Sequence, residues 1–122
     1  MNAEQKTTLR DRTRAFALQV IGLYAGLPKT TVAQVIGKQM LRAGTSVGAH
    51  HREAVRSRSD AEFVSKIEGA QQELEETMYW LELATAERLA PVDRLDAARI
   101  EADELMAMLA ASARTVKSKR ER

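Results

Sequence analysis

Residues 63–84 read FVSKIEGAQQELEETMYWLELA, and the spacing of their apolar positions decides the fold. Seven apolar or small residues alternate at intervals of four and three, which is the seam of a helix packed against other helices. They are Phe63, Ile67, Ala70, Leu74, Thr77, Leu81 and Ala84. The spacing predicts a helix from about Asp60 to Arg88, begun by an N-cap at Ser59-Asp60.

Three more amphipathic helices follow from the 3.6-residue period outside this stretch. The first runs from about Thr7 to Leu27 and is ended by Pro28, because the residue before a proline is pushed out of helical geometry. The second runs from its N-cap at Thr30 or Thr31 to Arg58, and the fourth begins near Pro91. Their predicted core positions are Leu9, Phe16, Val20, Leu23 and Leu27; Ile36, Ala43, Val47 and Ala54; and Leu95, Ala98, Ala102, Leu105 and Leu109. Short connections between four such helices predict an all-α, antiparallel up-down-up-down four-helix bundle over residues 1–113. We expect residues 114–122 to form a disordered basic tail.

Composition limits the class of protein further. The chain has 122 residues, of which 44% are hydrophobic and 30% charged, and it has no cysteine. This length suggests one domain, and the absence of cysteine excludes a disulfide scaffold, a thiolate metal site and a cysteine nucleophile. No apolar run is long enough to span a bilayer, and no signal peptide is visible. We therefore expect a soluble cytoplasmic protein that makes no membrane contact.

The sequence offers no catalytic arrangement. The two histidines, His50 and His51, are adjacent, and neighbours on a helix point about 100° apart, so they cannot hold one metal ion together. Ser46 has no visible His/Asp partner to activate it. No phosphate-binding glycine loop is present. We expect no enzyme activity, no cofactor and no metal.

Charge is strongly segregated along the chain. Residues 1–58 carry ten Lys/Arg against three Asp/Glu, residues 59–113 carry four against thirteen, and residues 114–122 carry five against one. Such asymmetry is typical of a protein with an anionic partner. The alternative interpretation is that basic and acidic helices complement each other, within one chain or between chains.

The basic residues of the second helix form a line. Lys38, Arg42, Arg52 and Arg56 fall within an arc of about 80°, opposite the predicted core face. A second line, at i, i+4 spacing on the first helix, consists of Lys6, Arg10 and Arg14. Such lines can neutralise successive phosphates of a nucleic acid. Solvated helix faces also carry Lys and Arg without any ligand.

Three glycines, Gly37, Gly44 and Gly48, lie on one side of the second helix. A glycine inside a helix costs about 1 kcal/mol relative to alanine. Three on one side therefore predict the close approach of another helix, inside the bundle or between subunits. The alternative is a locally weak or kinked helix.

Two stretches resemble a known family. QMLRAGTSVGAH at residues 39–50, followed by Glu53-Ala54, resembles the "LRSGTSVGAN…EA" signature of the four-helix-bundle family named after 23S ribosomal RNA intervening sequences. The later block matches the family's "DF..K…A..E..ET.YWL" pattern. It consists of Asp60, Phe63, Lys66, Ile67, Ala70, Glu73, Glu76, Thr77, Tyr79, Trp80 and Leu81. The chain departs from the signature at His50, where the family usually has Asn.

The resemblance implies an up-down bundle that assembles into a homopentamer. Relatives include the accessory variability determinant of diversity-generating retroelements, which binds nucleic acid and a reverse transcriptase. Our first hypothesis is a non-enzymatic oligomer that binds nucleic acid, RNA above all, through the two basic lines, assisted by the basic tail. Our second is an adaptor for a protein partner such as a reverse transcriptase, with the basic face used in subunit or client contacts.

Overall fold

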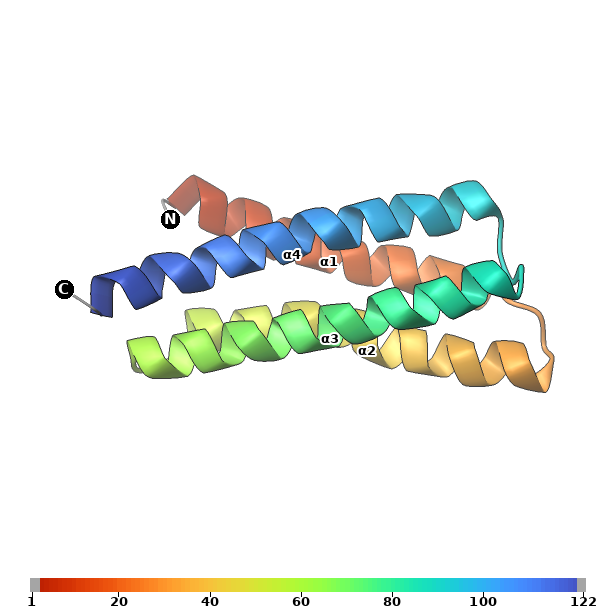
Figure 1. Ribbon diagram of the computed structural model, residues 1–122, viewed down its shortest axis with the longest axis horizontal. Helices are drawn as coiled ribbons and strands as arrows, with labels where there is room; N and C mark the ends of the chain where they lie inside the picture. The colour runs from red at the N-terminus through yellow and green to blue at the C-terminus, as the bar shows by residue number, and fades with distance from the viewer. Residues whose placement is uncertain (1–2, 121–122) are drawn as a thin grey trace.

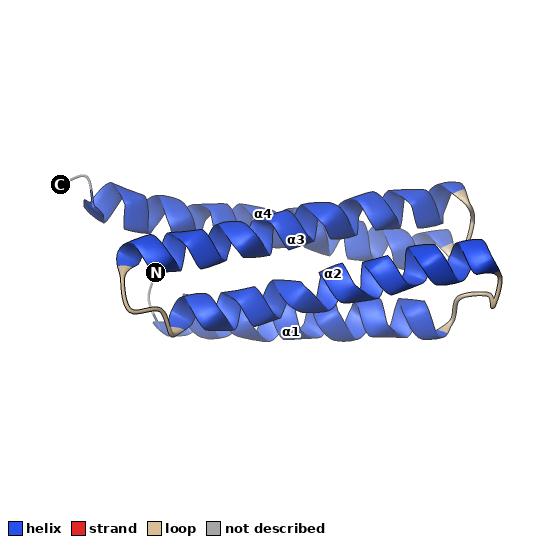
Figure 2. Cartoon of the chain, turned by 90° about the horizontal axis from the view of Figure 1, so that it is seen from below, coloured by secondary structure: helices blue, strands red, loops and turns tan. Residues whose placement is uncertain are grey.

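The computed structural model describes the backbone of residues 3–120 and the side chains of residues 9–119. Four helices account for almost all of it: α1 (Ala3–Ala25), α2 (Thr31–Val55), α3 (Asp60–Ala86) and α4 (Val92–Arg120). Successive helices run in opposite directions, so α1 begins and α4 ends at the same end as the α2–α3 connection (Figures 1 and 2). The predicted all-α up-down-up-down bundle is confirmed.

Local hydrogen bonds explain where the middle helices begin. The side chain of Thr30 accepts a hydrogen bond from the Ala33 amide at 3.3 Å, and that of Ser59 accepts one from the Glu62 amide at 3.1 Å. Both are N-caps that satisfy otherwise unpaired amides of the first turn. Helix α1 ends shortly before Pro28, because a proline disfavours helical geometry in the residue before it. Both predicted N-caps are confirmed.

The last connection contains the one left-handed non-glycine residue of the described chain. Arg88 has a φ of 53°, which lets the backbone reverse after α3. The carbonyl of Pro91 then accepts hydrogen bonds from the amides of Arg94 and Leu95, so α4 begins directly after the proline. A proline suits this place because the first amides of a helix have no partner within the helix.

The predicted seams form the core. Of the predicted core positions, all but Phe63 are buried. Phe63 is half-buried near the end of the bundle, where it lines a cavity. Each helix contacts two neighbours, so that α1 lies between α2 and α4, and α3 lies between the same two helices on the other side.

Two apolar side chains of α1 are left uncovered. Leu18 is 51% exposed and Ile21 is 42% exposed. Both lie on the side of α1 opposite the buried Phe16 and Val20, because one helical turn takes about 3.6 residues. Part of the apolar surface of α1 is therefore left exposed to solvent in a single chain.

Helix α4 extends further than we expected. Its last turns run through Arg120, whereas the sequence led us to expect a disordered tail from residue 114. The half-buried Val116 packs there, and the Nζ atom of Lys117 lies 3.2 Å from Oε2 of Glu68 on α3. These contacts tie the basic segment to the bundle. Residues 121–122 lie outside the described part of the chain.

Over residues 3–120, no helix combines the length and the apolar character that a bilayer crossing requires.

Candidate nucleic-acid interface

The three glycines of α2 face α1. A Cβ atom added at Gly44 would lie 2.9 Å from both γ-methyl groups of Val20, and one at Gly48 would lie 3.3 Å from Oγ1 of Thr13. At Gly37 the same atom would meet the side chains of Leu27 and Tyr24. The glycines therefore let α1 side chains sit against the α2 backbone, as the close-packing interpretation predicts. This contact lies within one chain.

The basic line of α2 is divided by an ion-pair cluster at its centre. The guanidinium of Arg42 bonds to Glu76 and, at 3.1 Å, to Oε2 of Glu73, both on α3. Here a basic helix does meet an acidic one inside the bundle. Arg42 is consequently engaged, although its side chain remains 49% exposed.

The other members of that line stay open. Lys38, Arg52 and Arg56 are exposed, and none of them forms an ion pair with any side chain among residues 9–119. Lys38 stands 14 residues from Arg52, or about 21 Å along the helix. Arg52 and Arg56 are one turn apart and form a compact cationic pair near the end of α2.

The basic line of α1 meets this pair. Arg10 and Arg14 are exposed, and neither forms an ion pair with any other described side chain. The side chain of Lys6 lies outside the described residues. Burial lowers the pKa of His51, and the nearby positive charges of Arg10 and Arg52 lower that pKa further. His51 of α2 is therefore near enough to Arg10 of α1 and to Arg52 of its own helix for both charges to act on it.

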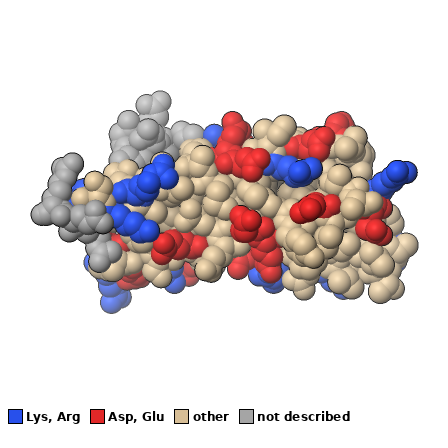
Figure 3. All heavy atoms as spheres, in the orientation of Figure 1, with Lys and Arg blue, Asp and Glu red and all other residues tan. Residues whose placement is uncertain are grey.

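The fold then adds basic residues from distant segments to the same end. Arg58 follows α2 directly, and Arg114 and Lys119 lie in the last turns of α4, all of them exposed. The view of the α3–α4 side shows neighbouring basic groups near the end with the chain termini, and acidic groups interspersed with further basic groups over the middle and the far half (Figure 3). We call Arg10, Arg14, Arg52 and Arg56 the basic surface.

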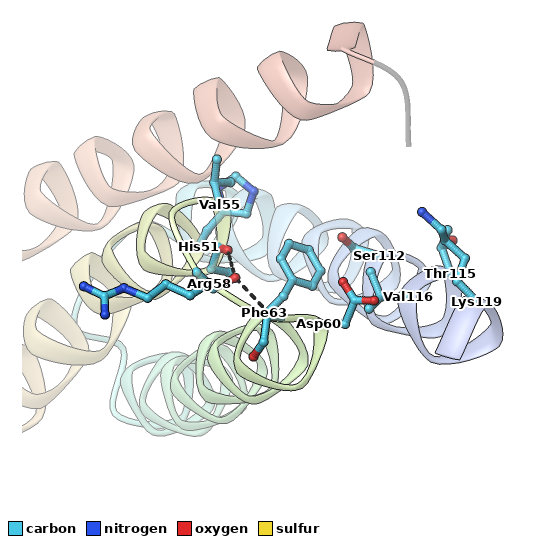
Figure 4. Close-up of a pocket in the computed structure, with 12 residues that line it drawn as sticks. His51, Val55, Arg58, Asp60, Phe63, Ser112, Thr115, Val116 and Lys119 are labelled. Carbon is cyan, nitrogen blue, oxygen red and sulfur yellow. Dashed lines mark hydrogen bonds between the residues drawn. The ribbon is translucent and has the colours of Figure 1, made fainter. Parts of the chain in front are cut away.

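A cavity of about 400 Å³ opens at this end of the bundle. It lies between the end of α2, the start of α3 and the last turns of α4 (Figure 4). Its lining residues are His51, Ala54, Val55, Ser57, Arg58, Ser59, Asp60, Phe63, Ser112, Thr115, Val116 and Lys119. This cavity could not be predicted from the sequence, because its walls come from two segments that lie about 50 residues apart along the chain. The only sequence signal was Phe63, a seam position that falls at a helix start.

Sequence reasoning also missed a polar cluster between α1 and α4. The guanidinium of Arg12 donates to Oε1 of Glu101 at 2.6 Å and to Oε2 of Glu104 at 3.1 Å. The hydrogen bond to Glu101 and both negative charges raise the pKa of Arg12, against the opposing effect of burial. Within the described part of the chain, no three His, Asp or Glu side chains are grouped so as to hold a metal ion.

These features define a class: an up-down four-helix bundle with most of its basic groups on α1, on α2 and at the end of α4. The chain belongs to the family described as 23S rRNA-intervening sequence protein, which matches residues 5–111. It is similar to a crystal structure of a protein of unknown function from the S23 ribosomal protein family of Bacteroides thetaiotaomicron. The two are 31% identical with a TM-score of 0.84, over 90% of this chain and 98% of that one. No curated protein matches the chain.

Proposed function

We propose that this protein is a non-enzymatic, homo-oligomeric cytoplasmic protein that binds nucleic acid, RNA above all, through backbone phosphates. The observation that carries the proposal is the basic surface, formed by exposed arginines of the neighbouring helices α1 and α2. None of its four arginines is paired with a carboxylate of the described side chains, so each can meet a phosphate. Phosphate contacts of this kind give affinity with little sequence preference.

Self-association is supported by the outward side of α1. Leu18 and Ile21 remain about half exposed, and a second copy of the chain would remove them from water. Burying apolar area contributes about 25 cal/mol per Å². An assembly built on this side would also bring the basic surfaces of neighbouring copies together and strengthen the field that attracts a polyanion.

The test is a charge reversal with a matched control. The double variant Arg52→Glu plus Arg56→Glu changes the net charge by four at the basic surface. Arg88→Glu plus Arg99→Glu makes the same change elsewhere on the molecule. We expect the first variant to lose at least tenfold in affinity for a short RNA duplex at about 50 mM salt, and the control to lose far less. An equal loss of affinity in both variants would mean that the net charge of the protein, and not the basic surface, determines binding.

The salt dependence of wild-type binding provides a second measurement. Each phosphate neutralised on a duplex contributes about 0.9 to the slope of log K against log salt. Four arginines at one surface predict a slope of about −3 to −4 per subunit engaged. A chain that binds neither RNA nor DNA at low salt contradicts the proposal.

The second candidate function is an adaptor for a protein partner, and the Arg42 cluster favours it. There the basic residue of α2 already serves helix–helix contact, through Glu73 and Glu76. If the basic surface serves subunit or client contacts in the same way, Arg52→Glu plus Arg56→Glu will dissociate the oligomer. Light scattering of that variant separates the two functions, because nucleic-acid binding predicts an intact oligomer.

A further inference from the structure

The end cavity is lined by several polar groups. Ser112 is 6% exposed and His51 is 3% exposed. Nδ1 of His51 has no hydrogen-bond partner among the described residues, and Ser112 and Thr115 contribute hydroxyl groups to the lining. Hydroxyl groups that line a cavity offer hydrogen bonds to a ligand inside it.

The walls of the cavity combine one flat apolar surface with several polar groups. Figure 4 shows the Phe63 ring projecting from α3 toward Ser112, with the Asp60 carboxylate beside Ser112 and Val116. Thr115 and Lys119 of α4 lie on the far rim, whereas the side chain of Arg58 extends away from the cavity. The interior thus suits a planar group with hydrogen-bonding edges, and the carboxylate disfavours an anion inside.

We propose that the end cavity takes one unpaired nucleobase of the nucleic acid whose phosphates lie on the basic surface. The base stacks on Phe63, its edge is bonded by the hydroxyl of Ser112, and the carboxylate of Asp60 accepts from an exocyclic amino group. The volume of about 400 Å³ falls in the usual range of small-ligand sites. This inference rests on the proposed function, because the cations outside the cavity must hold the strand.

The geometry of the cavity predicts two preferences among nucleic-acid ligands. A strand with an unpaired end can place a base in the cavity, but a blunt duplex must first break a pair, which costs free energy. Cytosine and adenine carry the amino group that a carboxylate accepts from, whereas uracil lacks it. A cytosine or adenine overhang should therefore bind better than a blunt duplex, and better than a uracil overhang.

The experiment compares RNA hairpins with equal numbers of phosphates, one blunt and the others ending in three unpaired cytosines or uracils. We expect the cytosine overhang to bind the full-length oligomer about tenfold more tightly than the blunt hairpin. A 2-aminopurine placed in the overhang should lose fluorescence on binding, because it stacks on Phe63. The Asp60→Asn variant should bind cytosine and uracil overhangs alike.

Two variants change the lining of the cavity and leave the four arginines of the basic surface in place. Ser112→Met fills it, and Phe63→Leu removes the aromatic wall while keeping an apolar side chain. Both should lose the preference for the overhang and the fluorescence change, with blunt-hairpin affinity unchanged and the helical circular-dichroism signal retained. If one variant fails to fold, the other still tests the cavity.

The outcomes separate this inference from the proposed function. Equal affinity for blunt and overhanging hairpins in the wild type, with unchanged fluorescence, overturns the nucleobase site and leaves phosphate binding standing. An overhang preference that survives Ser112→Met also overturns it. Failure of every hairpin to bind at low salt removes both proposals. Loss of the preference in the filled cavity supports the site.

Discussion

The two sides of α1 are held in different ways. Toward α2 the contact is steric, because Gly44 leaves a hole that Val20 fills against the helix backbone. Toward α4 the contact is polar, because Arg12 reaches across to Glu101 and Glu104. The first contact is dry and specific in shape, while the second is partly exposed to water. The difference indicates that shape fixes how α1 sits on α2, and charge orients α4 beside it.

The largest effect on stability is expected at Gly44, where the steric fit against Val20 determines the contact. Gly44→Val would place three carbon atoms where a Cβ already lies 2.9 Å from Val20. Overpacking of this kind costs about 1–3 kcal/mol, and the β-branched side chain regains little helix propensity. We expect a loss of about 3 kcal/mol in the free energy of unfolding, measured by urea denaturation. A loss under about 1 kcal/mol would mean that the α1–α2 contact adapts easily.

The ion pairs between α1 and α4 should contribute less to stability than the steric contact between α1 and α2. Arg12→Met keeps an unbranched apolar stem but removes the charge that faces Glu101 and Glu104. Partly exposed ion pairs contribute roughly 0.2–1 kcal/mol, so we expect a loss near the upper end, measured by thermal or urea unfolding. The loss should shrink in about 1 M salt, which screens exposed charges.

Arg99→Met is the matched control for Arg12→Met, because the one ion pair that Arg99 forms among residues 9–119 is with Asp96, 3.8 Å away on its own helix. It should change stability by no more than a few tenths of a kcal/mol. If both variants lose the same amount, Arg12 does not hold α1 against α4.

The histidine between α1 and α2 makes that contact sensitive to pH. Burial, followed by the charges of Arg10 and Arg52, lowers the pKa of His51 in the folded state. The unfolded chain therefore takes up a proton first as pH falls below about 6.5, and stability falls from there until pH passes the folded-state pKa. Urea unfolding between pH 8 and 5.5 should show this decline. His51→Gln should flatten the decline, and an unchanged profile would remove His51 as its cause.

The smallest effect is expected at the roomier end of the glycine strip. A Cβ at Gly48 meets Oγ1 of Thr13 at 3.3 Å, a contact that a small shift relieves. Alanine also gains about 1 kcal/mol in helix propensity over glycine. Gly48→Ala should therefore lie within about half a kcal/mol of the wild type by urea denaturation. A large loss there would extend the tight fit along the whole α1–α2 contact.

The sequence predicted the elements well, because the apolar period, the N-caps at Thr30 and Ser59 and the helix stop at Pro28 are local signals. It also favoured a close helix contact at the three glycines over a locally weak or kinked helix, since close packing can offset their cost in helix propensity. The strip by itself could not show which helix approaches, and the structure assigns it to α1.

The candidate site was predicted less completely. Helical spacing places Lys38, Arg42, Arg52 and Arg56 on one arc, but it cannot show that Arg42 bonds to α3 while Arg52 joins Arg10. Those outcomes depend on the register between helices, which is set by the core. The expected tail beyond residue 113 continues as helix because of contacts at Val116 and Lys117 that no local pattern records.

The up-down arrangement of four helices has a practical consequence. The start of α1 and the end of α4 lie at the same end of the bundle as the cavity, so a purification tag fused next to either helix terminus would crowd that region. The turns at Pro28 and Arg88 lie at the opposite end, about 40 Å away along a helix as long as α3. A fluorophore attached at one of those turns would report on the protein without shielding the residues under study.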